Sequence, residues 1–362
     1  MSAAIVAGVL AGKARNGGNA WTRLSFLLGL RRLGFDVLFA ERLHSVSDEG
    51  RRFFESVCSQ FGIDAVLFNG AVPAELDDRA SDATILINIS GHLGPNAFAG
   101  HRLVRVFLDD DPGYTQLWHS QGLLGNQLAG HDFYYTFGQN IGHAGCSLPT
   151  GDISWHPIAP PVVLEEWPVI EGEDREFTTV ASWRGGYGRV EGSGHLYGQK
   201  AHEFRRYVDV PRRVAASFEI ALDIEPADAA DADLMRMHGW RLSDPCVSVS
   251  SPDTFREYVQ RSKAEFSVAQ GIYVETNSGW FSDRTTRYLA SGKPALVQDT
   301  GFSKHLPSTE GLVAFSRIDQ AVAGAEAILR DYQTHAETAR AIAVEYFDSD
   351  KVLGHMLEEV GL

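Results

Sequence analysis

Residues 278–301 (SGWFSDRTTRYLASGKPALVQDTG) constrain the fold more than any other stretch of the chain. Their pattern predicts a short helix over residues 285–291, because Gly292 suits the position just after a helix end. Residues 295–298 are an apolar run that is typical of a buried parallel strand. The turn at 299–301 then lies at the carboxyl end of that strand, where open α/β sheets bind ligands. The segment therefore predicts an α/β protein with a parallel sheet.

The start of this helix carries the residue types that bind anions. Gly279 permits an unusual backbone turn, and Ser282 or Asp283 can cap the helix. Helix N–H groups beside the guanidinium of Arg284 form a ready anion site. A turn, helix and strand in this order are also common in α/β proteins that bind no phosphate. The prediction of an anion site therefore depends on the residue types and not on the order of the elements.

The same residues resemble the donor-binding segment of GT-B glycosyltransferases, and most of all bacterial family 1 or family 4-like members of the spore-coat type that open with Ser-Asp-Arg-Thr. The resemblance implies that Ser282, Asp283 and Arg284 hold the diphosphate of a nucleotide-sugar. Many retaining members carry two glutamates here with seven residues between them, and this chain has Gly279 and Arg287 at those positions. The usual ribose and sugar contacts are therefore not carried over, and Asp283 is the candidate replacement for one of them.

The alternation of strands and helices predicts two Rossmann-like, doubly wound domains facing a cleft. We expect residues 1–170 to form an acceptor domain and residues 176–344 the nucleotide-sugar domain, with few contacts across the cleft. A proline-rich linker is expected between residues 149 and 174, including the charged run 171–175. The resemblance further implies that a helix over about residues 345–362 packs back onto the first domain.

Composition excludes several classes of partner. The chain has 362 residues, 32 basic and 47 acidic, and its formal net charge of −15 argues against nucleic acid and anionic membranes. No apolar run is long enough to cross a bilayer, and the first residues lack the features of a signal peptide, so we expect a cytoplasmic protein without an integral membrane segment. Cys58, Cys146 and Cys246 show no paired spacing, which predicts neither disulfides nor a zinc site.

Three positions in the first half are candidates for contact with donor or acceptor, and Gly18 is the candidate donor contact among them. Gly18 lies in the Gly-Gly-Asn turn between the first strand and helix, and His92 lies in a loop after the strand at 82–89. Asp110 is the middle residue of an aspartate run, 109–111, at another strand end. An Asp-x-Asp spacing also occurs at the metal sites of GT-A enzymes, but their organisation differs, so a general base or an acceptor contact is the better interpretation. A structural role stays open for all three.

Three positions in the second half are candidates for donor binding. Arg184 follows a strand at 177–181 and precedes a Gly-Gly step, which lets the backbone approach phosphate oxygens. The resemblance implies that Arg184 and Lys200 face the diphosphate, with an ordinary surface lysine as the alternative for Lys200. Trp240 is a candidate platform for the nucleotide base, with a position in the core as the alternative.

These features predict a glycosyltransferase that moves a sugar from a UDP- or dTDP-linked donor to a hydroxyl group of a small molecule or glycan. The scheme needs no metal and no cofactor, because fixed positive charge stabilises the leaving diphosphate. If the enzyme inverts the anomeric centre, His92 or Asp110 is the expected base; if it retains it, these residues position sugar or acceptor. A nucleotide-sugar epimerase and a non-catalytic binding protein remain alternatives. The sequence leaves the oligomeric state, the sugar and the acceptor open.

Overall fold

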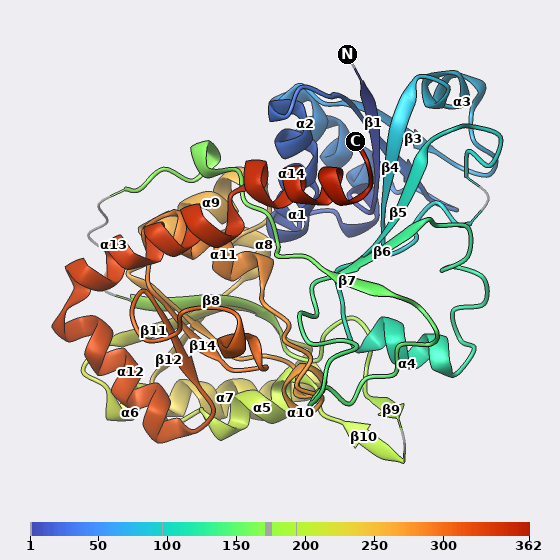
Figure 1. The fold of residues 1–362 in the computed structure, drawn as a ribbon. Coiled ribbons are helices and arrows are strands. Elements are labelled where there is room, and N and C mark those ends of the chain that lie inside the picture. The colour runs from blue at the N-terminus through green and yellow to red at the C-terminus, as the bar shows by residue number, and fades with distance from the viewer. Residues whose placement is uncertain (1, 96, 171–175, 193) are drawn as a thin grey trace.

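The computed structural model describes residues 2–95, 97–170, 176–192 and 194–362. Two parallel sheets organise the chain, and each belongs to one of two lobes (Figure 1). The charged run 171–175 of the expected linker lies outside the described residues.

The N-terminal lobe contains a 7-stranded sheet in the order β3-β2-β1-β4-β5-β6-β7, and all of its strand pairs are parallel. Its strands are β1 (Ala3–Ala7), β2 (Asp36–Arg42), β3 (Asp64–Phe68), β4 (Ala83–Ile89), β5 (Val104–Asp109), β6 (Phe133–Thr136) and β7 (Trp155–Pro157). Its helices are α1 (Gly17–Arg32), α2 (Asp48–Phe61), α3 (Ala74–Ala80) and α4 (Tyr114–Ser120). Strands β1 and β4 are almost wholly buried, as expected for apolar runs in the centre of a covered parallel sheet.

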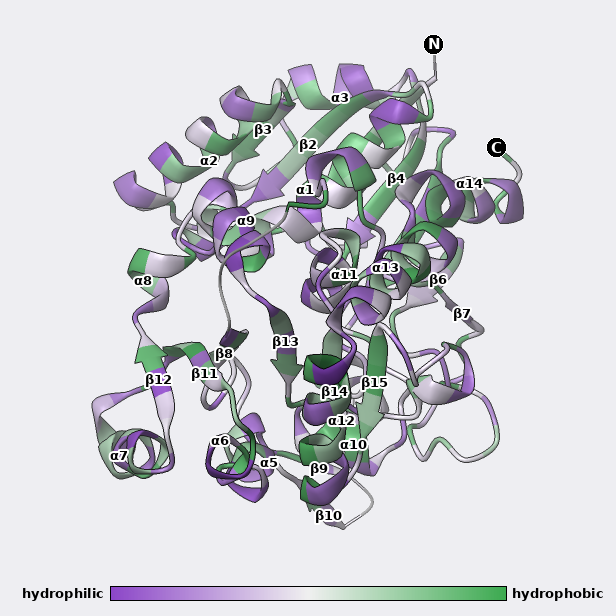
Figure 2. Ribbon diagram, turned by 90° about the vertical axis from the view of Figure 1, so that its left-hand side faces the viewer, coloured by the Kyte–Doolittle hydropathy of each residue, from purple (hydrophilic) through white to green (hydrophobic). Residues whose placement is uncertain are grey.

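The C-terminal lobe contains a 6-stranded parallel sheet in the order β12-β11-β8-β13-β14-β15. Its strands are β8 (Glu176–Ser182), β11 (Ser217–Asp223), β12 (Trp240–Ser243), β13 (Ala264–Ser267), β14 (Ala295–Gln298) and β15 (Leu312–Phe315). A small antiparallel hairpin, β9 (Val190–Gly192) and β10 (His195–Tyr197), follows β8. In Figure 2, β14 and β15 are coloured mainly as hydrophobic, which fits their place inside the lobe.

The helices of the C-terminal lobe connect these strands. They are α5 (Lys200–Arg206), α6 (Val210–Arg213), α7 (Ala229–Met237), α8 (Pro245–Ser248), α9 (Pro252–Arg261), α10 (Gly271–Glu275), α11 (Asp283–Ala290), α12 (Ile318–Arg330) and α13 (Tyr332–Ile342). Helix α11 begins after the cap Ser282, whose hydroxyl accepts from the backbone N–H of Arg284, and Gly292 follows its end with a φ of 68°. The predicted helix and strand at 285–291 and 295–298 are thus present, and the helix begins two residues earlier and ends one residue earlier than predicted.

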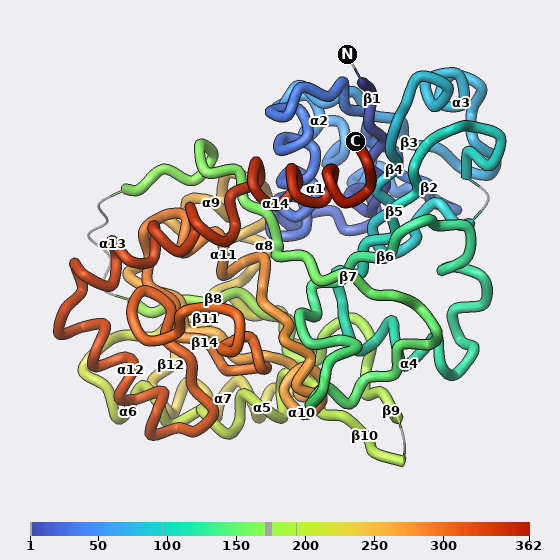
Figure 3. The backbone as a smooth tube through the Cα atoms, viewed as in Figure 1, coloured from blue at the N-terminus to red at the C-terminus, as the bar shows by residue number. Residues whose placement is uncertain are grey.

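The last helix, α14 (Ser349–Glu359), returns to the N-terminal lobe and lies against α1 (Figure 3). Arg32 of α1 donates two hydrogen bonds of 2.8 Å to the carboxylate of Asp350. The approach is close at Gly29, where a Cβ atom would lie 2.6 Å from Leu353 Cδ1. The chain therefore crosses between the lobes twice, near residues 158–170 and just before α14.

The lobes share buried apolar surface, which differs from the expectation of few contacts. One hydrophobic cluster includes Trp21 of α1, Trp167 of the crossing segment and Phe255 of α9. The Trp21 and Trp167 ring centroids are 4.9 Å apart, and the Trp21 indole N–H donates to Pro252 O at 2.8 Å. The first turn of α1 is therefore anchored in the C-terminal lobe.

Candidate functional site

A cavity of about 530 Å³ lies between the two lobes. The N-terminal lobe contributes residues at the start of α1, and the C-terminal lobe contributes the carboxyl ends of β8 and β11 together with α5, α9 and α11. The main polar lining residues are Asn16, Asn19, Thr22, Arg23, Ser182, Lys200, Asp223, Gln270, Asp283, Arg284 and Arg287. Strand carboxyl ends are the usual ligand-binding edge of a doubly wound sheet.

The loop before α1 is held rigidly beside this cavity. The carboxylate of Glu41, which is fully buried, accepts from the backbone N–H groups of Leu10, Ala11 and Gly12 at 2.9, 2.7 and 2.9 Å. Burial raises the pKa of Glu41, and the three N–H groups oppose that shift. Because one buried carboxylate accepts hydrogen bonds from three consecutive backbone N–H groups, it fixes the path of the chain into the helix.

Gly17 and Gly18 form the first turn of α1 rather than a loop before it. The other lobe lies directly against both residues. A Cβ atom on Gly17 would lie 2.1 Å from Ser251 O, and one on Gly18 would lie 3.0 Å from Phe255 Cε2. Gly18 lines the cavity, as does Asn19, whose backbone N–H donates to the cap Asn16 at 2.9 Å. The two glycines thus let the positive end of a long helix reach the cavity.

Two arginines in the cavity wall have unused donors. The Arg23 side chain is 7% exposed and contacts Asp110 at 3.4 Å, while Arg287 is 1% exposed and contacts Asp283 at 3.0 Å. Nε of each has no hydrogen-bond partner. Within the described part of the chain, Nη1 of each also donates no hydrogen bond. Because buried guanidinium groups are normally saturated, these incompletely paired groups leave positive charge in the cavity wall, which favours an anionic ligand.

Lys200, the first residue of α5, adds a third positive group to the cavity. Burial and the nearby charge of Arg284 lower the pKa of Lys200 to about 7. An anion beside this amine would favour its charged form and restore the pKa.

Arg284 differs from Arg23, Arg287 and Lys200 because its guanidinium N–H groups donate hydrogen bonds to other residues of the protein. Its Nε donates to Glu265 Oε1 at 2.7 Å, its Nη1 to Val180 O at 3.0 Å and its Nη2 to Ser267 Oγ at 2.8 Å. Glu265 is fully buried. Arg284 lines the cavity, but its main contacts tie α11 to β8 and β13, which corrects its expected role as a free diphosphate ligand.

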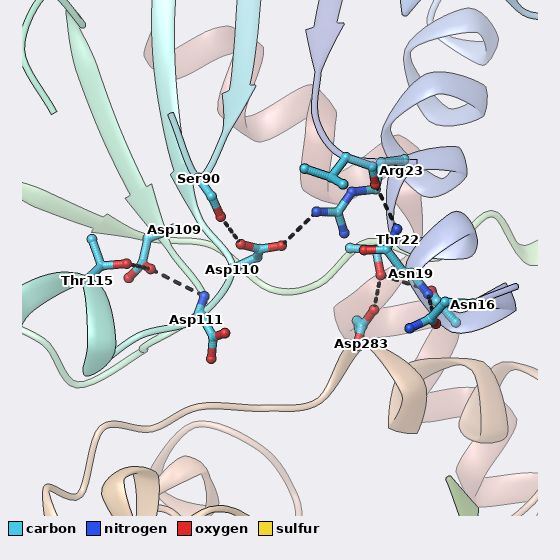
Figure 4. A network of polar contacts seen from close by, with 12 residues as sticks. Asn16, Asn19, Thr22, Arg23, Ser90, Asp109, Asp110, Asp111, Thr115 and Asp283 are labelled. Carbon is cyan, nitrogen blue, oxygen red and sulfur yellow. Dashed lines mark hydrogen bonds and ion pairs between the residues drawn. The ribbon is translucent and has the colours of Figure 1, made fainter. Parts of the chain in front are cut away.

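Ser282 and Asp283 serve local and inter-lobe contacts. Ser282 is 2% exposed, caps α11 and does not line the cavity. The Asp283 carboxylate lines the cavity and accepts from Thr22 Oγ1 of the N-terminal lobe (Figure 4). Burial opposes its charge, but Arg287, Thr22 and Arg284 outweigh burial and lower the pKa of Asp283.

Arg184 and Trp240 lie away from the cavity. Arg184 is half-exposed and forms a two-point ion pair with Asp228, at 2.5 and 2.6 Å. Trp240 is 3% exposed within the core of the C-terminal lobe, where its ring lies 5.3 Å from that of Phe204 and its indole N–H donates to Val208 O. A ring packed on all sides offers no face to a base, so the stacking role of Trp240 is wrong.

His92 and Asp110 lie behind the cavity wall rather than in it. His92 Nε2 accepts from the backbone N–H of Arg42 at 3.1 Å. Burial, with Arg23 and Arg42, lowers the pKa of His92 to about 4. Asp110 accepts from Ser90 Oγ and contacts Arg23, as Figure 4 shows. Asp110 therefore supports Arg23, His92 is bonded to the end of β2, and neither residue lines the cavity.

The sequence analysis missed the residues from α1 that line the cavity, Asn19, Thr22 and Arg23, and also Gln270 and the open guanidinium of Arg287. One available signal was an arginine on the apolar face of a helix that begins with two glycines. Arg23 follows Trp21 and precedes Leu24, and all three are buried. Among the described residues, no group of three or more His, Cys, Asp or Glu side chains could hold a metal ion, and no helix has the length and apolar character needed to cross a membrane.

No protein-family model matches the chain, and no curated protein matches it in sequence. Solved structures match its fold. HepE from Anabaena, in complex with UDP and glucose, has a TM-score of 0.63 at 11% identity, with 99% of both chains covered. Sucrose-phosphate synthase from Thermosynechococcus elongatus has a TM-score of 0.59 at 10% identity, again with 99% of both chains covered. AviGT4, a glycosyltransferase involved in avilamycin A biosynthesis, has a TM-score of 0.56 at 12% identity, covering 99% of this chain and 97% of its own.

Likeness at this level of identity shows the fold. The parallel sheets of 7 and 6 strands match those of the GT-B glycosyltransferases, so the expected fold class is confirmed. The subgroup with a Ser-Asp-Arg-Thr opening stays a prediction.

Proposed function

We propose that the protein is a glycosyltransferase that binds a nucleoside-diphosphate sugar in the cavity between its lobes. The observation that carries the proposal is the set of positive groups in the cavity wall, Arg23, Arg287 and Lys200, in a chain whose net charge is −15. Among the described residues, Nε of both arginines has no hydrogen-bond partner. A volume of about 530 Å³ suits a ligand of nucleotide size. The HepE structure with UDP and glucose supports a UDP-linked donor, and a dTDP-linked donor remains the other candidate.

The diphosphate in this proposal lies between the start of α1 and the side chains of Arg23, Arg287 and Lys200. Pro245, Val249 and Phe255 form an apolar part of the cavity wall, which suits the nucleoside. Fixed positive charge and helix N–H groups stabilise the departing diphosphate, so transfer proceeds without a metal ion. The N-terminal lobe, residues 1–170 with the returning C-terminal helix, holds the acceptor, and residues 176–344 hold most of the donor.

A panel of nucleotide-sugars tests this function. Purified protein is incubated with UDP-glucose, UDP-N-acetylglucosamine and dTDP-glucose, with and without EDTA, and with water or simple sugars as acceptors. Release of UDP or dTDP, unchanged by EDTA, is the expected result. Conversion of the donor to an isomer without nucleotide release would identify the epimerase alternative, and saturable binding without turnover would identify a non-catalytic binding protein. Absence of binding would contradict the proposed function.

The low pKa of Lys200 predicts proton uptake when UDP binds. Without ligand, Lys200 titrates near pH 7 and is mostly neutral at pH 8. A bound diphosphate raises that pKa, so the protein takes up a proton at pH 8 and its affinity for UDP falls as the pH rises through 7 to 9. Calorimetry in buffers of different ionisation enthalpy measures the uptake. The Lys200→Met variant should lose it, and equal uptake in the variant and the wild type would rule out Lys200 as its source.

A further inference from the structure

The three aspartates after β5 have different environments. Asp109 is fully buried, and its carboxylate accepts from Thr115 Oγ1 at 2.6 Å, Gln116 Nε2 at 2.7 Å and Thr136 Oγ1 at 2.7 Å. All of these partners belong to the N-terminal lobe. Asp109 is thus a structural residue that joins β5 to α4 and β6.

Asp110 is also engaged within its own lobe. One carboxylate oxygen accepts from Ser90 Oγ, and the other contacts Arg23 Nη2 at 3.4 Å. Both carboxylate oxygens of Asp110 thus have contacts within the N-terminal lobe.

Asp111 instead faces the other lobe. Its Oδ1 accepts from the hydroxyl of Tyr273 on α10, and its Oδ2 accepts no hydrogen bond within the described residues. Figure 4 shows the Asp111 side chain turned away from those of Asp109 and Asp110. The residue is partly exposed, so its free oxygen is open to a ligand.

Asp111 does not itself line the cavity, but its contacts place it near the end of the cavity where Lys200 and Gln270 lie. The Tyr114 hydroxyl donates to Gln270 Oε1 at 2.7 Å, and the Tyr114 ring lies 6.4 Å from that of Tyr273. Lys200 is close enough for the charge of Asp111 to raise its pKa, against the larger effect of burial. Asp111 is therefore on the N-terminal side of the proposed diphosphate site.

We propose that Asp111 binds the acceptor hydroxyl through its free Oδ2 and takes the hydroxyl proton during transfer. This inference rests on the proposed function and deepens it, because it assigns the acceptor-binding residue of the same cavity. A carboxylate held by one neutral donor, with the second oxygen free, has the geometry of a general base.

The step balances without any further reactant. The acceptor O–H bond breaks and its proton goes to Asp111 Oδ2, while the acceptor oxygen forms a bond to the anomeric carbon of the sugar. The bond between that carbon and the diphosphate oxygen breaks, and the nucleoside diphosphate leaves with the electron pair. Lys200 and the cavity arginines stabilise the charge that develops on the leaving group.

Burial raises the pKa of Asp111 to about 7, and the charges of Asp110 and Asp109 act in the same direction. The hydrogen bond from Tyr273 and the charge of Lys13 oppose the rise. Tyr114, Tyr187 and Lys200 are the other titratable groups that interact with the Asp111 charge. A pKa near the working pH suits a group that must accept a proton and later release it.

The Asp111→Asn variant tests the inference with UDP release from the best donor of the panel, measured with water and with simple sugars as acceptors. It should lose about 10²-fold or more in turnover, which is the usual size of a general-base effect, and should keep the UDP affinity of the wild type in calorimetry. Asp78→Asn is the matched control, because Asp78 is an exposed residue of α3 outside the cavity, and its turnover should match the wild type.

A pH profile separates a base from a structural residue. Wild-type turnover should rise with pH to a plateau with a midpoint near 7, because Asp111 acts when deprotonated. In Tyr273→Phe the loss of the hydrogen bond should move that midpoint upward and leave folding intact. Near-normal turnover in Asp111→Asn, or loss of turnover together with loss of UDP binding, would overturn the role of Asp111. Wild-type protein that binds no UDP would instead overturn the proposed function itself.

Discussion

Replacing Arg284 by alanine is expected to lower the free energy of unfolding by about 3–5 kcal/mol, the usual cost of removing one partner of a buried ion pair. The reason is Glu265, which is fully buried and receives from Arg284 Nε at 2.7 Å. Its second carboxylate oxygen already has no partner. Without Arg284 the charge of Glu265 would be buried and uncompensated, and Val180 O would lose a donor.

Chemical denaturation measures the effect, and two further variants identify its cause. Adding Glu265→Gln to Arg284→Ala should recover much of the lost stability, because a neutral amide is less costly to bury than a carboxylate. Arg79→Ala is the control, since Arg79 is 38% exposed with ion pairs of 3.4 Å, and exposed pairs contribute about 0–1 kcal/mol. A stable Arg284→Ala protein that has lost only nucleotide affinity would show that Arg284 acts as a ligand after all.

Replacing Arg23 by alanine is expected to weaken UDP binding by about 1.5–3 kcal/mol, the range for a charge-assisted hydrogen bond. Arg23 is a cavity arginine of the N-terminal lobe, and its only described hydrogen bond is the 3.4 Å contact with Asp110. Much of its capacity to donate hydrogen bonds is therefore open to the diphosphate. Calorimetric titration with UDP measures the change.

The Asp110→Asn variant gives the matched comparison. It removes the charge that competes for Arg23 and keeps the guanidinium, so UDP should bind as tightly as to the wild type or more tightly. Higher salt should weaken UDP binding to Asp110→Asn more than to Arg23→Ala, because one more charged contact is screened. Weaker UDP binding in Asp110→Asn, with wild-type affinity in Arg23→Ala, would mean that the carboxylate and not the arginine contacts the ligand.

Local patterns in the sequence predicted much of the fold. The cap Ser282, the glycine at 292 and the apolar run 295–298 define α11 and β14 through contacts within one segment. The predicted strands at 82–89 and 177–181 are present for the same reason, with shifts of no more than one residue at their ends. The sequence analysis did not predict β15 or the hairpin of β9 and β10. Strands β9 and β10 have three residues each, which is too little pattern for a strand to be recognised alone.

The candidate site was harder to predict, because its geometry depends on contacts between distant residues. The local sequence of Arg284 is typical of an anion ligand, but Glu265, which lies beside it in the structure, comes from β13, nineteen residues earlier in the chain. Arg23 and Arg287 meet the same cavity from helices in different lobes, and no spacing in the sequence connects them. Trp240 has the right residue type for stacking on a base, but only its neighbours Phe204 and Phe218 show that the ring is buried.

A crystal structure of the protein with UDP tests the central claim most directly. The account predicts UDP in the cavity between the lobes, with diphosphate oxygens within hydrogen-bond distance of Lys200 Nζ and of the free guanidinium nitrogens of Arg23 and Arg287. UDP bound elsewhere, or a cavity that stays empty at saturating UDP, would contradict the account.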